Sequence, residues 1–458
     1  MGSVFQLLFT ISIAIVAYNV YVFLQKPAPK LEIDNDGWYG SGQKRADKEA
    51  IVAFQVNVPD DVLQDLRMRL QNTRISHEPL EDSDNFEYGF NANFLRTVIR
   101  YWAEKFDWRK QEAIINRFPQ FTTEIEGLKV HFIRAKPPAK KYSRIVPLLI
   151  VHGWPGNVFE FYKIIPMLTD PSSNLGLESS IAFEVIAPSI PGYGWSDASR
   201  KTGFNQWSTA RIFRKLMLRL GHNKFLLQGG DWGSLVCTNI ALYYPQNVLG
   251  LHLNMAFMTP YANPKTMFRA IVGSIAPSAV FSSPKAYSFN LKNLFFMVLA
   301  ESGYLHLQAT DPDSVGTGLN DSPVGLAAYI LNKFAAWTNR HYRSLPDGGL
   351  TQKFTMDELL TILSIYWING NIVNSQRYYK EFFLSPQRTI VESAYLTIPT
   401  AFAAFPNELF DPPPKEMIEC KYNLTSYTEM PTGGHFAALE EPKLLAEDIF
   451  KFSSILHL

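Results

Sequence analysis

A single acidic residue, Asp231, lies where the local sequence predicts a sharp turn between a strand and a helix. The apolar run at residues 225–227 is typical of a buried strand, and the run at residues 235–242 is typical of the helix that follows. Gly229 and Gly233 stand two residues before and two residues after the acid, where small residues are needed because the backbone passes close to its neighbours. We therefore expect the Asp231 carboxylate at the carboxyl edge of a sheet, beside a helix N-terminus that favours its ionised form.

A carboxylate at this turn indicates displacement chemistry. An aspartate is a poor nucleophile toward acyl carbon but can attack saturated carbon, which gives an alkyl ester that water can later cleave. The alternative is structural, because Asp231 can simply cap the helix that follows a Gly-Gly-Asp turn. These residues alone do not decide between the two interpretations.

An earlier strand-to-loop corner can supply hydrogen-bond donors to the same chemistry. The β-rich run at residues 146–151 ends in the sequence His-Gly-Trp-Pro-Gly at residues 152–156. Where a nucleophile sits on a strand-to-helix turn, an early corner of this kind supplies one backbone N–H, and the residue after the nucleophile supplies another. We therefore predict that the backbone N–H groups of Trp154 and Trp232 form an oxyanion hole.

The C-terminal part of the chain offers an acid and a base. Residues 396–405 are typical of a late strand that ends just before Glu408, and His435 lies further on, in a glycine-bearing loop before a helical segment. Nucleophile, acid and histidine then follow the chain order found where the nucleophile sits on a strand-to-helix turn of this kind. A lone histidine is more often structural, and a carboxylate after a strand is often a solvated loop residue. Their joint occurrence behind Asp231 favours catalysis.

With further motifs, these residues resemble the microsomal-type epoxide hydrolases of the α/β-hydrolase superfamily, a family that includes insect juvenile hormone epoxide hydrolases. The resemblance covers nearly the whole chain and implies an α/β fold, the α/β-hydrolase fold, with a helical lid. Besides the N-terminal apolar segment, it rests on these motifs: His152-Gly153-Trp154-Pro155-Gly156, Gly229-Gly230-Asp231-Trp232-Gly233, Glu301-Ser302-Gly303-Tyr304, Ser375-Gln376-Arg377-Tyr378-Tyr379-Lys380, Pro406-Asn407-Glu408 and Gly433-Gly434-His435-Phe436.

The resemblance also implies a role for each side chain. Asp231 corresponds to the nucleophile, and Glu408 with His435 corresponds to the pair that activates water. Tyr304 and Tyr379 correspond to lid acids that hydrogen-bond the epoxide oxygen. An alignment by eye leaves the second acid open, because Tyr378 adjoins Tyr379.

The implied reaction converts a lipophilic epoxide and water to a vicinal diol, and juvenile hormone is one candidate substrate. Neither a metal nor an organic cofactor is needed. A haloalkane dehalogenase is the nearer rival, since such enzymes also use an aspartate nucleophile; a halide needs N–H donors, however, whereas the hydroxyls of Tyr304 and Tyr379 suit an epoxide. A non-catalytic, membrane-tethered binder of hydrophobic ligands is the other rival, and retention of every catalytic residue argues against it.

The N-terminal segment predicts a membrane anchor. Residues 4–24 carry no charge, and about 20 helical residues cross a hydrocarbon core about 30 Å thick. A cleaved secretory signal is the alternative, although no basic region precedes the apolar run. Lys26 and Lys30 follow the segment, which favours a single-pass protein of the endoplasmic reticulum membrane with a cytosolic catalytic body. Membrane lipid is then a partner.

Composition fits this organisation without naming an activity. The chain has 458 residues, 47% of them hydrophobic, and a formal net charge of +1, which argues against a nucleic-acid partner. Cys237 and Cys420 do not suggest a disulfide framework. The patterns predict five segments: an anchor (1–25), an N-terminal extension with the first strands (26–140), a first part of the core (141–259), a helical lid (260–394) and a second part of the core (395–458).

Overall fold

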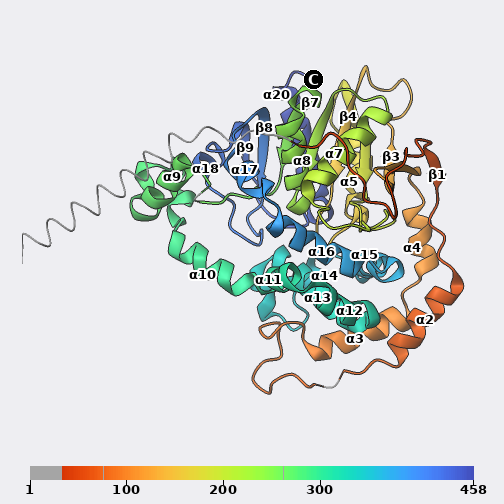
Figure 1. The fold of residues 1–458 in the computed structure, drawn as a ribbon. Coiled ribbons are helices and arrows are strands. Elements are labelled where there is room, and N and C mark those ends of the chain that lie inside the picture. Colours follow the sequence, from red (N-terminus) through yellow and green to blue (C-terminus); the bar gives the residue numbers. More distant parts are fainter. Residues whose placement is uncertain (1–32, 76, 261) are drawn as a thin grey trace, which may run out of the picture.

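A computed structural model describes residues 33–75, 77–260 and 262–458 of the chain (Figure 1). The predicted anchor, residues 1–25, lies outside these described residues. Among the helices of the described part, none is both long enough and apolar enough to cross a bilayer.

One nine-stranded sheet forms the centre of the molecule, in the order β1-β2-β3-β5-β4-β6-β7-β8-β9. The first three strands and β5 pair antiparallel, and the pairs from β5 and β4 onward to β9 are parallel. Strand β5 is buried along its whole length, as expected for a strand covered on both faces. The strands are β1 (Val52–Phe54), β2 (Gln120–Ile125), β3 (Leu128–Ala135), β4 (Arg144–Val151), β5 (Ile181–Pro188), β6 (Phe225–Gly229), β7 (Val248–Leu253), β8 (Leu396–Ala404) and β9 (Tyr422–Glu429).

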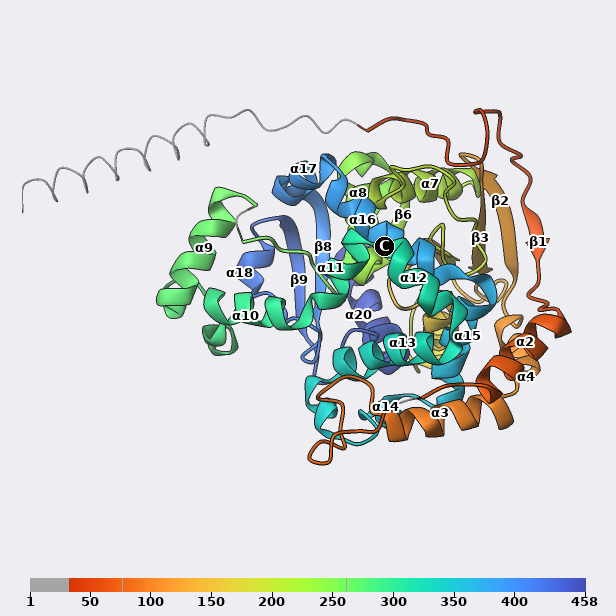
Figure 2. The ribbon, with the colours of Figure 1, turned by 60° about the horizontal axis from the view of Figure 1, so that its bottom comes forward.

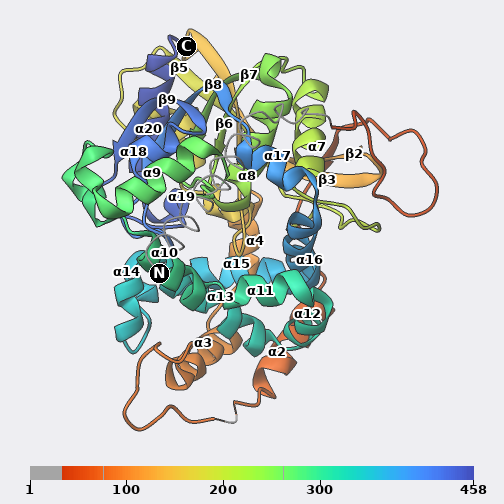
Figure 3. The same ribbon diagram turned by 60° about the vertical axis from the view of Figure 1, so that its left-hand side comes forward.

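Helices cover both faces of this sheet. Helix α7 (Gln206–Arg219) packs against α8 (Asp231–Tyr243), and α20 (Pro442–Ile455) packs against α5 (Ile164–Thr169). Figure 3 shows α7 and α8 on one side of the sheet and α20 on the other. The arrangement is that of an α/β-hydrolase fold. Its parallel strands present their carboxyl ends at one shared edge of the sheet.

An N-terminal unit extends the antiparallel edge of the sheet. It contains α2 (Asp60–Gln71), α3 (Ala92–Glu104) and α4 (Trp108–Ile115). Strands β2 and β3 form a hairpin whose turn residues, Glu126 and Gly127, both have positive φ, the backbone conformation of a tight two-residue turn. The Glu126 carboxylate is buried and pairs with Arg211 of α7 at 2.7 Å, which fixes this hairpin to the core.

A helical layer lies beyond the carboxyl edge of the sheet, with α11 to α16 gathered there (Figures 1 and 2). Helix α15 begins with a capping box between Thr355 and Glu358 and ends at Gly370 in the left-handed conformation, so both its ends are specified locally. The helices between β7 and β8 are α9 (Pro264–Ile275), α10 (Leu291–Glu301), α11 (Gly303–Thr310), α12 (Pro312–Asp321), α13 (Pro323–Thr338), α14 (Leu350–Lys353), α15 (Met356–Asn369), α16 (Asn371–Leu384) and α17 (Gln387–Ser393).

Candidate active site

The predicted sharp turn is present between β6 and α8. Asp231 is the first residue of α8 and has a φ of 45°, a left-handed conformation that a non-glycine residue adopts at a cost. A Cβ on Gly233 would lie 1.9 Å from the carbonyl oxygen of Val151, and one on Gly229 would lie 2.5 Å from the backbone of Gly233. The two glycines are therefore required by close backbone approach, as the sequence predicts.

The Asp231 carboxylate contacts groups from two other loops. Its Oδ1 accepts a hydrogen bond from the backbone N–H of Trp154 at 2.7 Å, and its Oδ2 lies 3.6 Å from His435 Nε2. Burial raises the pKa of Asp231, while the His435 charge and hydrogen bonds from the backbone of Trp154 and Trp232 act in the opposite direction. The ionised form expected from the helix N-terminus thus depends on these groups as well.

His435 forms a buried pair with Glu408. The distance from His435 Nδ1 to Glu408 Oε1 is 2.6 Å, and the same carboxylate oxygen accepts the backbone N–H of Leu409 at 2.8 Å. Burial by itself lowers the pKa of His435, but the charge and hydrogen bond of Glu408, together with the charge of Asp231, outweigh burial and raise that pKa to about 9. Nδ1–H therefore points to Glu408 and Nε2 faces Asp231.

A further carboxylate, Glu440, holds the His435 loop and has no counterpart in the sequence prediction. Its Oε2 accepts the backbone N–H of Gly434 at 2.9 Å, and its Oε1 accepts that of Phe436 at 2.8 Å. These two donors flank His435, whose own backbone N–H donates to the carbonyl of Trp337 at 3.0 Å. Three fixed hydrogen bonds thereby orient the imidazole. The only local signal is an acid five residues after the histidine.

The two predicted lid tyrosines lie over this centre. Tyr304, at the start of α11, stacks on Trp154 with ring centroids 5.4 Å apart, and Tyr379, in α16, meets Trp232 edge to face at 4.6 Å. Their own ring centroids are 6.0 Å apart. Burial, reinforced by the nearby negative charge of Asp231, raises the pKa of both phenols well above the usual value, so both hydroxyls keep their protons.

Tyr378 has a different environment from its neighbour. Its hydroxyl donates to Thr209 Oγ1 of α7 at 2.7 Å, within the buried core. That donor is already engaged on the side of the helix that faces α7. The Tyr378 hydroxyl is therefore not free to donate to a ligand beside Asp231, whereas the Tyr379 phenol interacts with the phenol of Tyr304, the other predicted lid acid.

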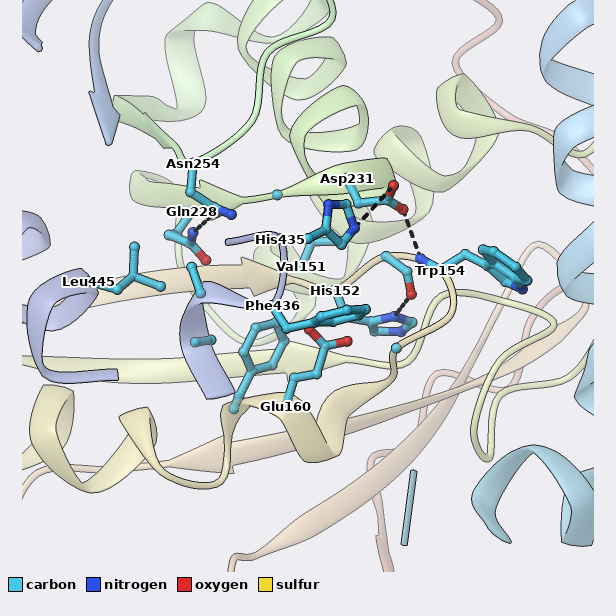
Figure 4. A pocket seen from close by; sticks show the side chains of 16 residues that line it. Val151, His152, Trp154, Glu160, Gln228, Asp231, Asn254, His435, Phe436 and Leu445 are labelled. Carbon is cyan, nitrogen blue, oxygen red and sulfur yellow. Dashed lines mark hydrogen bonds and ion pairs between the residues drawn. The ribbon is translucent and has the colours of Figure 1, made fainter. Parts of the chain in front are cut away.

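A small cavity opens beside the acid and the histidine. It offers about 20 Å³ to the centre of a water molecule and is lined by Asp231, His435 and Glu160 among others, which is room for about one water. Figure 4 shows the Glu160 carboxylate among the polar groups that line it. Glu160 lies in the short helix η1 (Val158–Phe161), and burial raises its pKa to about 8. No local sequence motif marks Glu160 as a site residue.

His152 explains why the loop before Trp154 holds its shape. Its Nε2 accepts the backbone N–H of Ile190 at 3.1 Å, and its Nδ1 lies 3.1 Å from the carbonyl of Gly153. Burial lowers its pKa to about 4, so the ring is neutral and can accept at one nitrogen while donating from the other. The ring ties the loops after β4 and β5 together.

The arrangement combines a buried carboxylate, two backbone donors, a paired histidine and two protonated phenols. Within the described ranges, no group of three or more His, Cys, Asp or Glu side chains could hold a metal ion. The chemistry that these side chains can perform is displacement by a carboxylate followed by hydrolysis of an ester.

Comparison with known proteins agrees with this chemistry. A family described as "Epoxide hydrolase N terminus" matches residues 51–161, and one described as "alpha/beta hydrolase fold" matches residues 146–442. Epoxide hydrolase 1 of Sus scrofa is 49% identical over 97% of this chain and 98% of its own length. Juvenile hormone epoxide hydrolase 1 of Ctenocephalides felis is 42% identical over 98% of this chain and 95% of its own length.

Solved structures give the same result. The crystal structure of juvenile hormone epoxide hydrolase from the silkworm Bombyx mori superposes with a TM-score of 0.86, at 38% identity, over 93% of this chain and 99% of that one. The Aspergillus niger epoxide hydrolase superposes with a TM-score of 0.72, at 28% identity, over 90% of this chain and 97% of that one. The chain belongs to the epoxide hydrolase family of the α/β-hydrolase fold.

Proposed function

We propose that this epoxide hydrolase converts lipophilic epoxides to vicinal diols through an ester on Asp231. The observation that carries the proposal is the engagement of the two carboxylate oxygens: Oδ1 faces the N–H of Trp154, and Oδ2 faces His435. One oxygen is thus held by an oxyanion donor, while the other is available for attack on carbon.

In the first half-reaction, Oδ2 of Asp231 attacks an epoxide carbon and the ring C–O bond breaks. Negative charge develops on the former ring oxygen, where Tyr304 and Tyr379 can each donate a hydrogen bond or a proton. Their high pKa values support this role because phenols that stay protonated near neutral pH are able donors. The engagement of Tyr378 by Thr209 supports Tyr379 as the second acid.

In the second half-reaction, water attacks the ester carbon, and His435 removes a proton from that water. The charge on Oδ1 is stabilised by the N–H groups of Trp154 and Trp232. The bond between the ester carbon and Oδ2 then breaks, and Oδ2 takes up the proton from His435 as the diol is released. A water in the cavity beside Asp231 and His435 is well placed for this attack. Asp231 regains its second oxygen from water.

The charge of His435 links the two half-reactions. Part of what raises its pKa to about 9 is the negative charge of Asp231, and ester formation removes that charge. The pKa of the imidazole therefore falls once the ester has formed, which favours the neutral form that the hydrolytic step needs, although the charge and hydrogen bond of Glu408 remain.

The substrate class follows from the surroundings of Asp231. Trp154, Trp337, Tyr304 and Tyr379 pack around one another, and an aromatic lining of this kind suits a lipophilic epoxide. Juvenile hormone is a candidate because four of the similar proteins carry that name. The test is diol formation from a panel of aryl, fatty-acid and terpenoid-ester epoxides, with Asp231→Asn as the inactive control. Absence of diol from every class would refute the proposed function.

The dehalogenase alternative is weaker. The relatives that match nearly the whole chain are epoxide hydrolases, and the hydroxyls of Tyr304 and Tyr379 suit an epoxide oxygen rather than a leaving halide. Halide release from chloro- and bromoalkanes, measured beside the epoxide panel, distinguishes the two reactions.

We further propose that residues 1–25 anchor the protein as a single pass in the endoplasmic reticulum membrane, with lipid as a partner and the catalytic body in the cytosol. The uncharged residues 4–24 and the following Lys26 and Lys30 support this orientation. Protease protection in microsomes tests it, because a cytosolic body is digested without detergent.

We also propose the five-segment division of the chain, in which a lid at residues 260–394 lies between two parts of the core. It is supported by the run of helices α9 to α17 between β7 and β8.

A further inference from the structure

Helices α9 and α10 carry an unusual concentration of exposed apolar side chains. More than half of the large apolar residues that are exposed in the described part of the chain fall between positions 267 and 307. Phe268 is 63% exposed, Phe295 62% and Leu299 62%. We define the α9–α10 face as the exposed apolar residues of these two helices: Met267, Phe268, Ile271, Ile275, Phe295, Phe296, Val298 and Leu299.

The spacing of these residues gives each helix one apolar outer side. On α9, positions 267, 271 and 275 recur every fourth residue, and on α10 positions 295 and 299 do the same. The inward side of α9 packs on a small separate core of Ala270, Phe281 and Met417. The exposed apolar residues of α9 and α10 are therefore not needed for the protein core, because these helices pack on this cluster with their opposite side.

The stretch of sequence that contains α9 and all but the last residue of α10 carries cations but no acidic residue. No Asp or Glu occurs from residue 232 to residue 300, although the chain has 42 acidic residues in all. The same interval contains Lys265, Arg269, Lys285 and Lys292. Arg269 and Lys285 pair with Glu419 and Glu429 from the C-terminal part of the chain, so Lys265 and Lys292 carry the charge argument. Lys265 and Lys292 are exposed at the starts of α9 and α10, so cations border the apolar side chains. An apolar helix face bordered by lysines matches the interfacial region of an anionic bilayer.

The face also adjoins the site. Figures 1 and 2 show α9 and α10 projecting from the body of the molecule. Helix α10 ends at Glu301, and α11, which carries Tyr304, begins at Gly303. A surface in contact with lipid would thus lie within one helix of a proposed lid acid, on the route of substrates that dissolve in the membrane.

We propose that the α9–α10 face docks on the surface of a bilayer that contains anionic lipid, with its phenylalanine and leucine side chains at the level of the headgroups. A second copy of the chain is a poorer occupant, because pairing two such faces would bring together the exposed Lys265 and Lys292 of both copies. The contact is additional to the proposed anchor and is independent of the catalytic proposal.

The test uses the full-length chain with one reporter at a time. Cys237 and Cys420 are buried, so a single introduced cysteine can be labelled selectively with a polarity-sensitive fluorophore. Phe268→Cys and Leu299→Cys report on the face. Met68→Cys is the matched control, since Met68 is 55% exposed on α2, at the opposite end of the molecule from α9 (Figure 2).

Labelled protein is reconstituted into vesicles of phosphatidylcholine with phosphatidylserine, and a nitroxide on the lipid serves as quencher. The proposal expects a blue shift and strong quenching at positions 268 and 299, and neither at position 68. Equal responses at all three positions would overturn it.

A charge variant distinguishes lipid docking from contact of the α9–α10 face with a second copy of the chain or with residues 1–32. Lys265→Glu with Lys292→Glu should abolish most of the quenching at position 299 and its dependence on phosphatidylserine, while epoxide turnover in detergent stays unchanged. A blue shift that persists without lipid and rises with protein concentration would assign the face to self-association. A shift that persists without lipid at every concentration would assign it to residues 1–32. Either result refutes lipid docking.

Discussion

The backbone N–H of Trp154 donates to Oδ1 of Asp231 at 2.7 Å in the resting site. In the proposed reaction, the donor that later holds the developing oxyanion is therefore already bonded to the oxygen on which that charge appears. Because this oxygen is engaged, Oδ2 is the free nucleophilic atom, and the two steps of the proposed reaction use different oxygens of one carboxylate.

The origin of the oxygen in the diol tests this division. If Oδ2 opens the ring, one turnover of excess enzyme in oxygen-18 water should give largely unlabelled diol, because the label enters Asp231 instead. Mass spectrometry of the diol and of the peptide containing Asp231 measures both. Label in the first-turnover diol would mean that water attacks the epoxide directly.

His435 should be needed for the second step and not for the first. With His435→Gln, the ester on Asp231 should accumulate, because no base remains to activate water. Intact-protein mass after mixing with substrate should then increase by the mass of the epoxide. Asp231→Asn serves as the control that cannot form the adduct. Normal steady-state turnover by the histidine variant would contradict its role.

The sequence predicts the Asp231 turn well because its requirements are local. Gly229 and Gly233 are needed for contacts made within a few residues of the tip and with one neighbouring strand, and hydrophobic runs identify that strand. The predicted strands before Asp231 and Glu408 and the fold class are confirmed for the same reason.

Other features depend on contacts that no local pattern encodes. Glu160 becomes part of the site because η1 folds back beside the cavity, and Glu440 matters because α19 (Ala437–Glu440) returns its carboxylate to Gly434 and Phe436. Likewise, the helices of residues 260–394 are predictable from periodicity, whereas the exposure of Phe268 and Phe295 is a property of the assembled structure.

Glu160 should make stability depend on pH. Its carboxyl has a pKa of about 8 in the folded protein against 4.5 ordinarily, so the unfolded chain releases this proton at lower pH than the folded chain does. Stability should therefore fall as pH rises from about 4.5 to about 8. Glu160→Gln cannot ionise, and its advantage over wild type in free energy of unfolding should grow across that window and then level off.

Urea denaturation in detergent at a series of pH values measures this effect, with the exposed Glu87→Gln as the matched control. If the difference in free energy of unfolding between Glu160→Gln and wild type stayed constant with pH, folding would not raise the pKa of Glu160, and the prediction would be wrong.

The two adjacent tyrosines of α16 give the sharpest test of the lid. Tyr379→Phe removes a hydroxyl that is proposed to face the epoxide oxygen, so the alkylation rate should fall by roughly 10²-fold, the scale of a positioned acid. Tyr378→Phe removes the hydroxyl that donates to Thr209; it should cost about 1 kcal/mol of stability and leave alkylation nearly unchanged. Stopped-flow tryptophan fluorescence can follow alkylation, since Trp154 and Trp232 contact Tyr379.

Tyr304→Phe should resemble Tyr379→Phe, and the double variant should nearly abolish ring opening. Hydrolysis of an ester that has already formed should continue in all three, because that step uses His435, Glu408 and the backbone donors. Thermal melting controls for packing: the two lid variants should melt close to wild type. Equal slowing of both steps, or an alkylation defect in Tyr378→Phe as large as that in Tyr379→Phe, would remove the lid phenols from the mechanism, because phenols that act only on the epoxide oxygen cannot slow ester hydrolysis.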